Sequence, residues 1–308
     1  MRAGNERHAP VIVGCGYVGS RVEHLHRERG EHCRALTCSG ASAAALRGRG
    51  IDATAQDVAA LTDEQAAALA GRRLYYLVPP EPRGRVDTRM RRFLAACAAH
   101  PPARIVSIGT TGLYGDCNGA WVDETRPPNP CADRAWRRWD GEQALRAWAD
   151  ETGCEVIFLR VAGIYGPERL PLRRIRSGAP IVRRDEAPYT NRIHVEDLAR
   201  LCQAAMMRGR PGRIYHACDG APGKMTDYFH AVADFAGLPR LPEIPLSEAR
   251  GRLSEGLLSY LRESRRLSNR RAREELGMRF RYPDLGRGLS ACGSPRRRDS
   301  LSPPSTNR

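Results

Sequence analysis

The sequence contains no two cysteines in CxxC spacing, no apolar run long enough to cross a membrane, and only one lysine among 308 residues. Ten cysteines are present, but without CxxC pairs they do not form the common zinc or thioredoxin-type motifs, so no metal site is predicted. A membrane-spanning helix needs about 18 or more consecutive apolar residues, so no membrane partner is expected. The apolar stretch at residues 11–18 is broken by glycines and lacks a cleavage site. We therefore reject a secretion signal and expect a cytoplasmic location.

The positive charge of the chain comes almost entirely from arginine. Lys224 is the single lysine, and the formal net charge of +15 rests on arginines scattered through the predicted helices and loops. Such scatter is typical of a solvated basic surface, and no nucleic-acid recognition motif accompanies it. We therefore expect no specific nucleic-acid partner and predict a monomer or homodimer.

Short apolar runs alternate with helical patterns over residues 11–165. This alternation predicts an α/β fold with a Rossmann-like, doubly wound parallel sheet. The predicted strands are 11–13, 32–37, 51–56, 74–78, 104–108 and 156–161, and the predicted helices are 17–29, one ending near 47, 63–70, 88–99 and 134–150.

The pattern changes to shorter pieces rich in proline and arginine after residue 166. A helix over 195–207 and a strand over 213–217 are expected to return to the sheet, whereas 222–280 is expected to be mostly helical. We predict an NAD(P)-binding domain at 1–165, completed by about 190–218, and a smaller, interleaved C-terminal substrate subdomain at 166–287. Residues 288–308 are rich in Ser, Pro and Arg without periodicity, which predicts a disordered tail.

A glycine turn follows the first predicted strand and opens a helix. Gly14, Gly16 and Gly19 form the GxGxxG spacing, with Tyr17 and Val18 inside the turn. The first glycine permits a tight turn, the second lets the backbone approach a pyrophosphate, and the third lets the helix pack close to the strand. Because the helix N-terminus attracts anions, the turn predicts a dinucleotide cofactor.

The end of the second strand distinguishes the two nicotinamide cofactors, since a carboxylate there binds the ribose hydroxyl of NAD. Thr37 stands near that position, and no acidic residue occurs between residues 32 and 51. Arg34, Arg47 and Arg49 occur in the same segment. The segment therefore favours NADP over NAD.

Six segments in order along the chain carry a family resemblance: GCGYVG at 14–19, Asp57 and Val58, TTGLYG at 110–115, LRVAGIYGP at 159–167, IHVEDLA at 193–199 and SNRRAREELG at 268–277. Together they resemble the extended short-chain dehydrogenase/reductase family, which contains the NAD-dependent epimerases and dehydratases. The resemblance implies that Asp57, followed by Val58, contacts the adenine. It also implies that Thr110 hydrogen-bonds the reacting oxygen of the substrate and that the segment around Tyr165 borders the substrate cavity.

The sequence departs from the family at its proton-transfer pair, a tyrosine followed four residues later by a lysine. The residue four positions before Lys224 is Gly220, so no YxxxK motif exists. If Glu142 is aligned with the glutamate that often follows the pair, the two positions are Arg134 and Arg138. Arginine has a pKa above about 12 and cannot act as a general acid or base near neutrality. The chain is thus similar to an atypical member of the family.

Three functions remain open from the sequence. The first is an oxidoreductase acting on a small carbonyl, alcohol or sugar nucleotide, in which Thr110 or Tyr114 orients the carbonyl and Arg138 anchors the ribose or an anionic substrate. Asp133 or Asp140 would then supply the proton. The second is a catalytically inactive NAD(P)-binding sensor or scaffold. The third, a nucleic-acid binder, ranks last because no recognition motif accompanies the charge.

Three further residues in these motifs are interpreted as structural. His194 is expected to be hydrogen-bonded in the core, and Asp197 is expected to cap or pair near the start of its helix. Tyr165 is expected to form part of a cavity wall rather than to take part in the chemistry.

Overall fold

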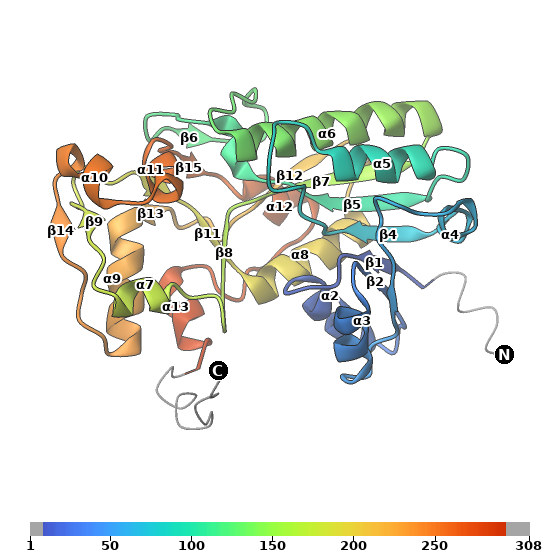
Figure 1. The fold of residues 1–308 in the computed structure, drawn as a ribbon, viewed down its shortest axis with the longest axis horizontal. Coiled ribbons are helices and arrows are strands. Elements are labelled where there is room, and N and C mark those ends of the chain that lie inside the picture. Colours follow the sequence, from blue (N-terminus) through green and yellow to red (C-terminus); the bar gives the residue numbers. More distant parts are fainter. Residues whose placement is uncertain (1–8, 294–308) are drawn as a thin grey trace, which may run out of the picture.

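A seven-stranded sheet forms the centre of the computed structural model, which describes residues 9–293 (Figure 1). In spatial order its strands are β12 (Ile214–Ala217), β7 (Glu155–Val161), β5 (Arg104–Ile108), β4 (Arg73–Tyr76), β1 (Val11–Val13), β2 (Arg34–Thr37) and β3 (Ala53–Ala55). All neighbouring strands are parallel. The strand order reverses between β1 and β4, and ligands of such sheets bind in the crevice at the carboxyl ends beside that reversal.

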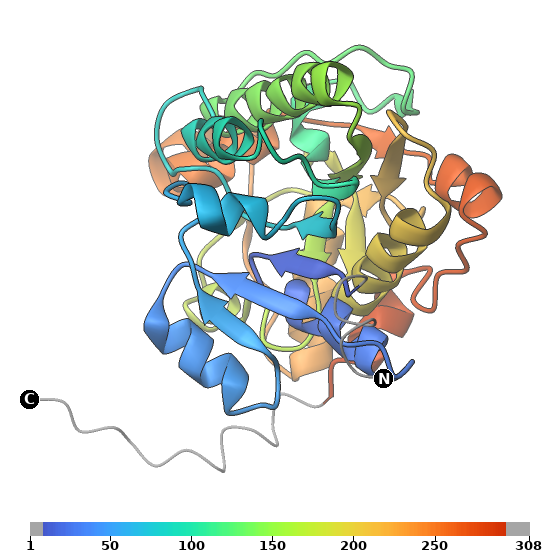
Figure 2. The same ribbon diagram turned by 90° about the vertical axis from the view of Figure 1, so that its right-hand side faces the viewer.

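Helices cover both faces of this sheet (Figures 1 and 2). One face carries α2 (Gly19–Arg27), α3 (Gly40–Arg47) and α8 (Val195–Arg208), and the other carries α4 (Asp63–Ala67), α5 (Thr88–Ala96) and α6 (Asp133–Thr152). Two separate clusters of buried apolar side chains fill the spaces between sheet and helices. Because both faces are covered, the central strands are apolar on both sides, as in the buried Val11–Val13. These observations confirm the predicted Rossmann-like, doubly wound α/β fold.

Most of the remaining elements gather at the carboxyl end of the sheet, whereas α12 (Arg270–Glu275) lies along the edge strand β12 (Figure 1). They comprise the 3-10 helix η1 (Thr111–Tyr114), β6 (Trp121–Val122), β8 (Gly163–Tyr165), α7 (Leu172–Arg176), β9 (Ile181–Val182), β10 (Tyr189–Thr190), β11 (Arg192–His194), β13 (Gly223–Lys224), α9 (Met225–Ala236), β14 (Glu243–Ile244), α10 (Leu246–Arg252), α11 (Glu255–Leu261), β15 (Arg266–Leu267) and α13 (Leu285–Ser290). Their short strands pair two by two, and α7, α9 and α13 enclose an apolar cluster of their own. The expectation of a mostly helical segment at 222–280 is incomplete, because β13, β14 and β15 are too short to leave a periodic pattern.

The predicted tail begins later than expected. Residues up to 290 belong to α13, whose Gly288 and Leu289 are buried. Gly288 fits there because the ring of Tyr165 occupies the place of a side chain, with the tyrosine oxygen only 1.8 Å from an ideal Cβ. The prediction of disorder is therefore wrong for residues 288–290, and for residues 294–308 it lies outside the described part of the chain.

The helices between residues 9 and 293 show no segment that is both long and apolar enough for a membrane span. Within the same range, no group of three or more histidine, cysteine or acidic side chains is arranged to hold a metal ion.

Candidate active site

The glycine turn has the shape that a pyrophosphate requires. Gly14 has a φ of +90°, and an ideal Cβ on it would lie 3.0 Å from the side chain of Val78 and 3.1 Å from the backbone of Leu77. A Cβ on Gly19 would lie 2.9 Å from the carbonyl oxygen of Gly14. A Cβ on Gly16, by contrast, would meet no atom within 4 Å. The open space above Gly16, next to the N-terminus of α2, fits a dinucleotide phosphate.

The two residues inside the turn have different surroundings. Val18 is buried in the core beneath α2. The hydroxyl of Tyr17 donates a hydrogen bond to the carbonyl oxygen of Pro167 at 2.7 Å, and the guanidinium of Arg21 lies 4.2 Å from the centre of its ring. The phosphate turn is therefore fastened to the segment that follows β8.

Thr37 and Asp57 lie where β2 and β3 end, at the carboxyl edge of the sheet. Asp57 is exposed, and its carboxylate accepts the backbone N–H of Ala59 at 3.0 Å. Val58 is buried in the cluster that packs under α4, α5 and α6. Both Thr37 and Asp57 therefore border the edge where the adenosine half of a dinucleotide would lie.

The arginines that favoured NADP lie at the opposite edge. Arg34 is the first residue of β2, and Arg47 donates to the carbonyl oxygen of Ala53 at the start of β3, at 2.9 Å. Arg49 lies in the loop that leads into β3. Because strands and crossover helices run in opposite directions, the end of α3 returns to the amino edge, away from the expected ribose. These three cations thus do not support the choice of NADP.

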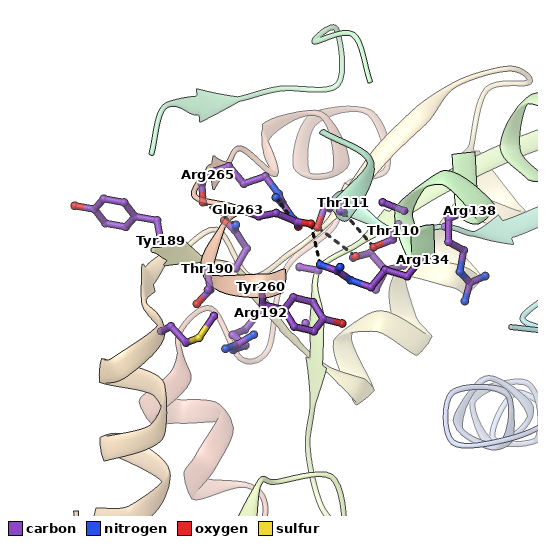
Figure 3. Close-up of a pocket in the computed structure, with 18 of the residues that line it drawn as sticks. Thr110, Thr111, Arg134, Arg138, Tyr189, Thr190, Arg192, Tyr260, Glu263 and Arg265 are labelled. Carbon is purple, nitrogen blue, oxygen red and sulfur yellow. Dashed lines mark hydrogen bonds and ion pairs between the residues drawn. The ribbon is translucent and has the colours of Figure 1, made fainter. Parts of the chain in front are cut away.

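A pocket of about 490 Å³ lies at the carboxyl ends of β5 and β7 (Figure 3). Thr110, Arg134 and Arg138 all line it, together with residues from β8, β10, β11, α9 and α11. Thr110 comes just after β5 and precedes η1, where its Oγ1 accepts the backbone N–H of Gly112 at 3.1 Å. Within residues 9–293 that hydroxyl donates to no other group, so its proton is available to donate to a ligand in the pocket.

Arg138 connects this pocket with the phosphate turn. Its guanidinium donates to the carbonyl oxygens of Val78 at 3.3 Å and Ile108 at 3.4 Å, just after β4 and at the end of β5. Val78 also packs against Gly14. Burial lowers the pKa of Arg138, and no carboxylate in the described chain forms an ion pair with it. A positive group therefore stands between the predicted cofactor site and the pocket.

Arg134 has a different environment, although it lines the same pocket. It donates to Glu263 at 2.8 Å and to Ser259 at 3.0 Å, and it stacks 4.0 Å from the ring centre of Tyr260. Glu263 is buried and also pairs with Arg265 at 3.1 Å. The charge of Arg134 is thus compensated within the protein.

Tyr114 does not reach the pocket. It is 1% exposed, its hydroxyl lies 2.6 Å from Nε2 of His216, and Arg160 donates to it at 2.7 Å. Arg160 in turn is held by Glu142 at 2.7 Å. Burial raises the pKa of Tyr114 to about 12. The structure thus places this expected catalytic residue in a buried polar network behind the pocket.

The two expected proton donors are also away from the pocket. Asp133 is exposed and pairs with Arg85 at 2.7 Å. Asp140 pairs with Arg91 at 2.6 Å and accepts the backbone N–H of Asp87 at 2.8 Å. Because they lie at other angles around α6 than Arg134 and Arg138, their side chains contact α5 and its preceding loop. Neither aspartate lines the pocket.

The three motif residues interpreted as structural are engaged in the protein interior. His194 accepts the backbone N–H of Glu196 at 3.3 Å, and burial lowers its pKa. Asp197 accepts the backbone N–H groups of Arg281 and Tyr282 at 2.9 and 2.7 Å, so it holds the segment before α13. Tyr165 is fully buried and does not line the pocket, in contrast to its expected place in a cavity wall.

Several pocket residues were not identified from the sequence. They are Arg192, Met225, Phe229, Tyr260, Glu263 and Arg265, and they come from β11, α9, α11 and the loop after α11. Only Arg192 adjoins a recognised motif, since it directly precedes IHVEDLA. The others stand in segments without a motif, and only the packing of the C-terminal elements brings them to the pocket.

Comparison with known sequences gives one family and a relative of similar length. The model of the NAD dependent epimerase/dehydratase family matches residues 11–218. Protein YeeZ of Escherichia coli (strain K12) is 26% identical over 285 residues, which cover 89% of this chain and 96% of that protein. A dTDP-glucose 4,6-dehydratase of Streptomyces niveus is 30% identical over 136 residues, which cover 41% of this chain and 40% of that enzyme.

Comparison with solved structures gives the same fold. A functionally unknown conserved protein from Silicibacter pomeroyi superposes with a TM-score of 0.78 and 29% identity, covering 96% of this chain and 100% of that one. UDP-glucose 4-epimerase from Thermotoga maritima, solved with UDP-glucose, superposes with a TM-score of 0.75 and 19% identity, covering 92% of this chain and 97% of that one. MoeE5, solved with UDP-glucose and NAD, superposes with a TM-score of 0.74 and 20% identity, covering 96% of this chain and 100% of that one.

Proposed function

The chain belongs to the NAD dependent epimerase/dehydratase family, and from this premise we propose that it is an NAD(P)-dependent oxidoreductase acting on a small carbonyl, alcohol or sugar-nucleotide substrate. One observation carries the proposal. Thr110 and Arg138 line one pocket, and Arg138 binds the carbonyl of Val78, which packs against Gly14 of the phosphate turn. A hydroxyl donor and a fixed cation therefore stand beside the place where a dinucleotide would end.

The cofactor would be held by the backbone of Gly14, Gly16 and Gly19 and by the N-terminus of α2. Thr37, Asp57 and Val58 would border its adenosine half. When bound, the nicotinamide ring accepts or donates the hydride. The structural relative MoeE5 was solved with NAD, which supports a nicotinamide dinucleotide here.

The choice of NADP now rests on fewer observations. No carboxylate stands between residues 32 and 51 to bind a ribose hydroxyl, and Thr37 leads directly to the N-terminus of α3, capped by Ser39. A helix N-terminus attracts a phosphate. We therefore propose NADP on the basis of α3, not of the arginines at the other edge.

The chemistry of this chain's own residues is polarisation of the substrate oxygen. The hydroxyl of Thr110 would donate a hydrogen bond to that oxygen, and Arg138 would stabilise the negative charge that develops on it during reduction. Because a guanidinium does not release its proton near neutrality, the proton that completes an alcohol would come from solvent through Thr110. When the alcohol is oxidised instead, its hydroxyl proton would leave to solvent through Thr110.

Turnover with matched variants tests this function. The purified protein is expected to consume NADPH with at least one member of a panel of carbonyl and sugar-nucleotide substrates. Thr110→Val should lower kcat by about 100-fold, as loss of one oxyanion donor typically does, whereas Thr110→Ser keeps the hydroxyl and should retain most of the rate. Arg138→Leu should also lower kcat. If Thr110→Val turned over like the wild type, the proposed role of Thr110 would be wrong.

A second candidate function is an NAD(P)-binding sensor or scaffold without turnover. The observation that favours it is that Arg134 and Arg138 both line the pocket. If Glu142 is aligned with the glutamate of the family, the resemblance assigns these two positions to the tyrosine and the lysine. Calorimetric titration with NADPH and NADH separates the two functions. Tight binding of either cofactor, without consumption by any substrate of the panel, would favour the sensor over the oxidoreductase.

A further inference from the structure

The pocket contains a second arginine whose charge is not compensated. Arg192, the first residue of β11, lines it, and its Nε is buried without a hydrogen-bond partner. Within residues 9–293, no carboxylate forms an ion pair with this guanidinium. Arg134 and Arg265 on the same pocket both form ion pairs with Glu263, so each has a carboxylate partner that Arg192 lacks. Within the described residues, Arg192 and Arg138 are therefore the pocket arginines without a carboxylate partner, and the charge of Arg192 is available to a ligand.

Neighbouring residues hold the guanidinium in place. Its Cζ lies 4.0 Å from the ring centre of Tyr228, and an ideal Cβ on Gly163 would lie only 2.4 Å from its Nη1. Glycine at position 163 thus leaves the space that the guanidinium fills. The aromatic contact and the missing side chain fix an otherwise flexible group, which reduces the entropy lost when it binds a partner.

One buried acid, Asp219, acts on the charge of Arg192 without forming an ion pair with it. Asp219 follows β12, and its backbone N–H donates to the carbonyl oxygen of Arg192 at 2.8 Å. Its carboxylate is buried and does not form an ion pair with Arg192, and burial raises its pKa to about 7. A partly buried cation without a full counter-charge is costly, and a bound anion would relieve that cost.

The surroundings of Arg192 also describe the rest of the ligand. Met225, Phe229 and Leu257 line the same pocket, and Tyr260 lies between Arg192 and Arg138 in the view of Figure 3. Guanidinium groups bind carboxylates and phosphates through parallel hydrogen bonds. Apolar walls favour a hydrocarbon portion next to that group.

We infer that Arg192 forms a subsite for an oxyanion group, a carboxylate or phosphate, of a small substrate whose body packs on Met225, Phe229 and Leu257. The inference rests on the proposed function, because it names the substrate class of the same pocket. Arg138 then faces the reacting end, and Arg192 binds the end that does not react.

Binding of three probes to the cofactor-free protein tests the subsite. Calorimetric titration compares 3-phenylpropionate and 2-phenylethyl phosphate with the uncharged 3-phenylpropanol. At least one anion should bind tenfold or more tightly than the alcohol, and the stronger of the two identifies the group. Arg192→Met should abolish this difference, while Arg184→Gln, which removes an exposed arginine paired with Asp227, should keep it.

Two results would overturn the inference: equal binding of the anions and the alcohol by the wild type, or an unchanged preference in Arg192→Met. If Arg192→Met does not fold, Gly163→Ala decides, since its Cβ displaces the guanidinium while the charge stays. A smaller preference of Gly163→Ala for the anions over the alcohol supports the subsite, and a preference equal to that of the wild type contradicts it. Because no cofactor or turnover is involved, an anion preference without turnover would reject only the oxidoreductase. Turnover without an anion preference would reject only the subsite.

Discussion

Replacing Tyr114 by phenylalanine removes a hydroxyl group that makes two hydrogen bonds in the protein interior. Arg160 donates one of them at 2.7 Å, and the hydroxyl donates the other to Nε2 of His216 at 2.6 Å. This direction follows because Nδ1 of His216 lies 3.0 Å from the carbonyl oxygen of Ser268, which can only accept, so Nδ1 carries the proton. Burial lowers the pKa of His216 to about 3 and keeps the ring neutral.

The expected cost follows from the burial of both partners. Arg160 is 2% exposed and His216 is 0% exposed, so water cannot replace the lost hydroxyl. A hydrogen bond to a charged group contributes about 1.5–3 kcal/mol and a neutral one about 1 kcal/mol. Tyr114→Phe should therefore lower the free energy of unfolding by about 2–4 kcal/mol. NADPH binding and turnover of the folded variant should remain near wild type, since the hydroxyl does not line the pocket.

Urea unfolding followed by far-ultraviolet circular dichroism measures this change. Tyr260→Phe is the matched control, because its ring is 51% exposed and a surface substitution usually changes stability by less than about 0.5 kcal/mol. A Tyr114→Phe protein as stable as the wild type but without turnover would refute the structural role. That result would indicate that Tyr114 is a catalytic residue.

Three further predictions concern the cofactor turn and the buried acids. Gly16→Asp should abolish NADPH binding without changing the melting temperature, because its side chain meets no protein atom; Gly251→Asp, at a similarly open position, should leave binding intact in the same titration. Asp219 has a pKa raised from 3.8 to about 7, so the folded state binds more protons than the unfolded state between these values. The free energy of unfolding should therefore fall by about 4 kcal/mol as pH rises from 3.8 to about 7. In Asp219→Asn, the midpoint of urea unfolding should depend less on pH between pH 4 and 8 than in the wild type. Glu142→Gln leaves the buried Arg160 without its carboxylate and should cost about 3–5 kcal/mol in urea unfolding, whereas Glu142→Leu combined with Arg160→Met should recover much of that loss.

The parts of the protein that the sequence predicted are those determined by local chemistry. The alternation of apolar runs and helical patterns required a doubly wound sheet, because each strand and helix buries its own apolar residues. The turn from Gly14 to Gly19 was recognisable locally, since three glycines in GxGxxG spacing directly follow a strand and open a helix. The absence of a YxxxK motif is likewise a property of the sequence alone.

The direction in which side chains point was decided by tertiary structure. Tyr114 lies within the recognised motif TTGLYG, yet Arg160 from β7 and His216 from β12 hold it in the interior. Arg34 and Arg47 are near Thr37 in sequence, but a strand and a returning helix carry them to the opposite edge of the sheet.

The pocket itself depends on contacts between distant segments. Thr110 and Arg138 belong to the first half of the chain, whereas Arg192 and Glu263 come from segments that pack across the end of the sheet. No local pattern marks these later residues as a group. Sequence determined the framework because local preferences repeat along the chain, and tertiary structure alone decided the pocket because its charges come from segments that meet only after folding.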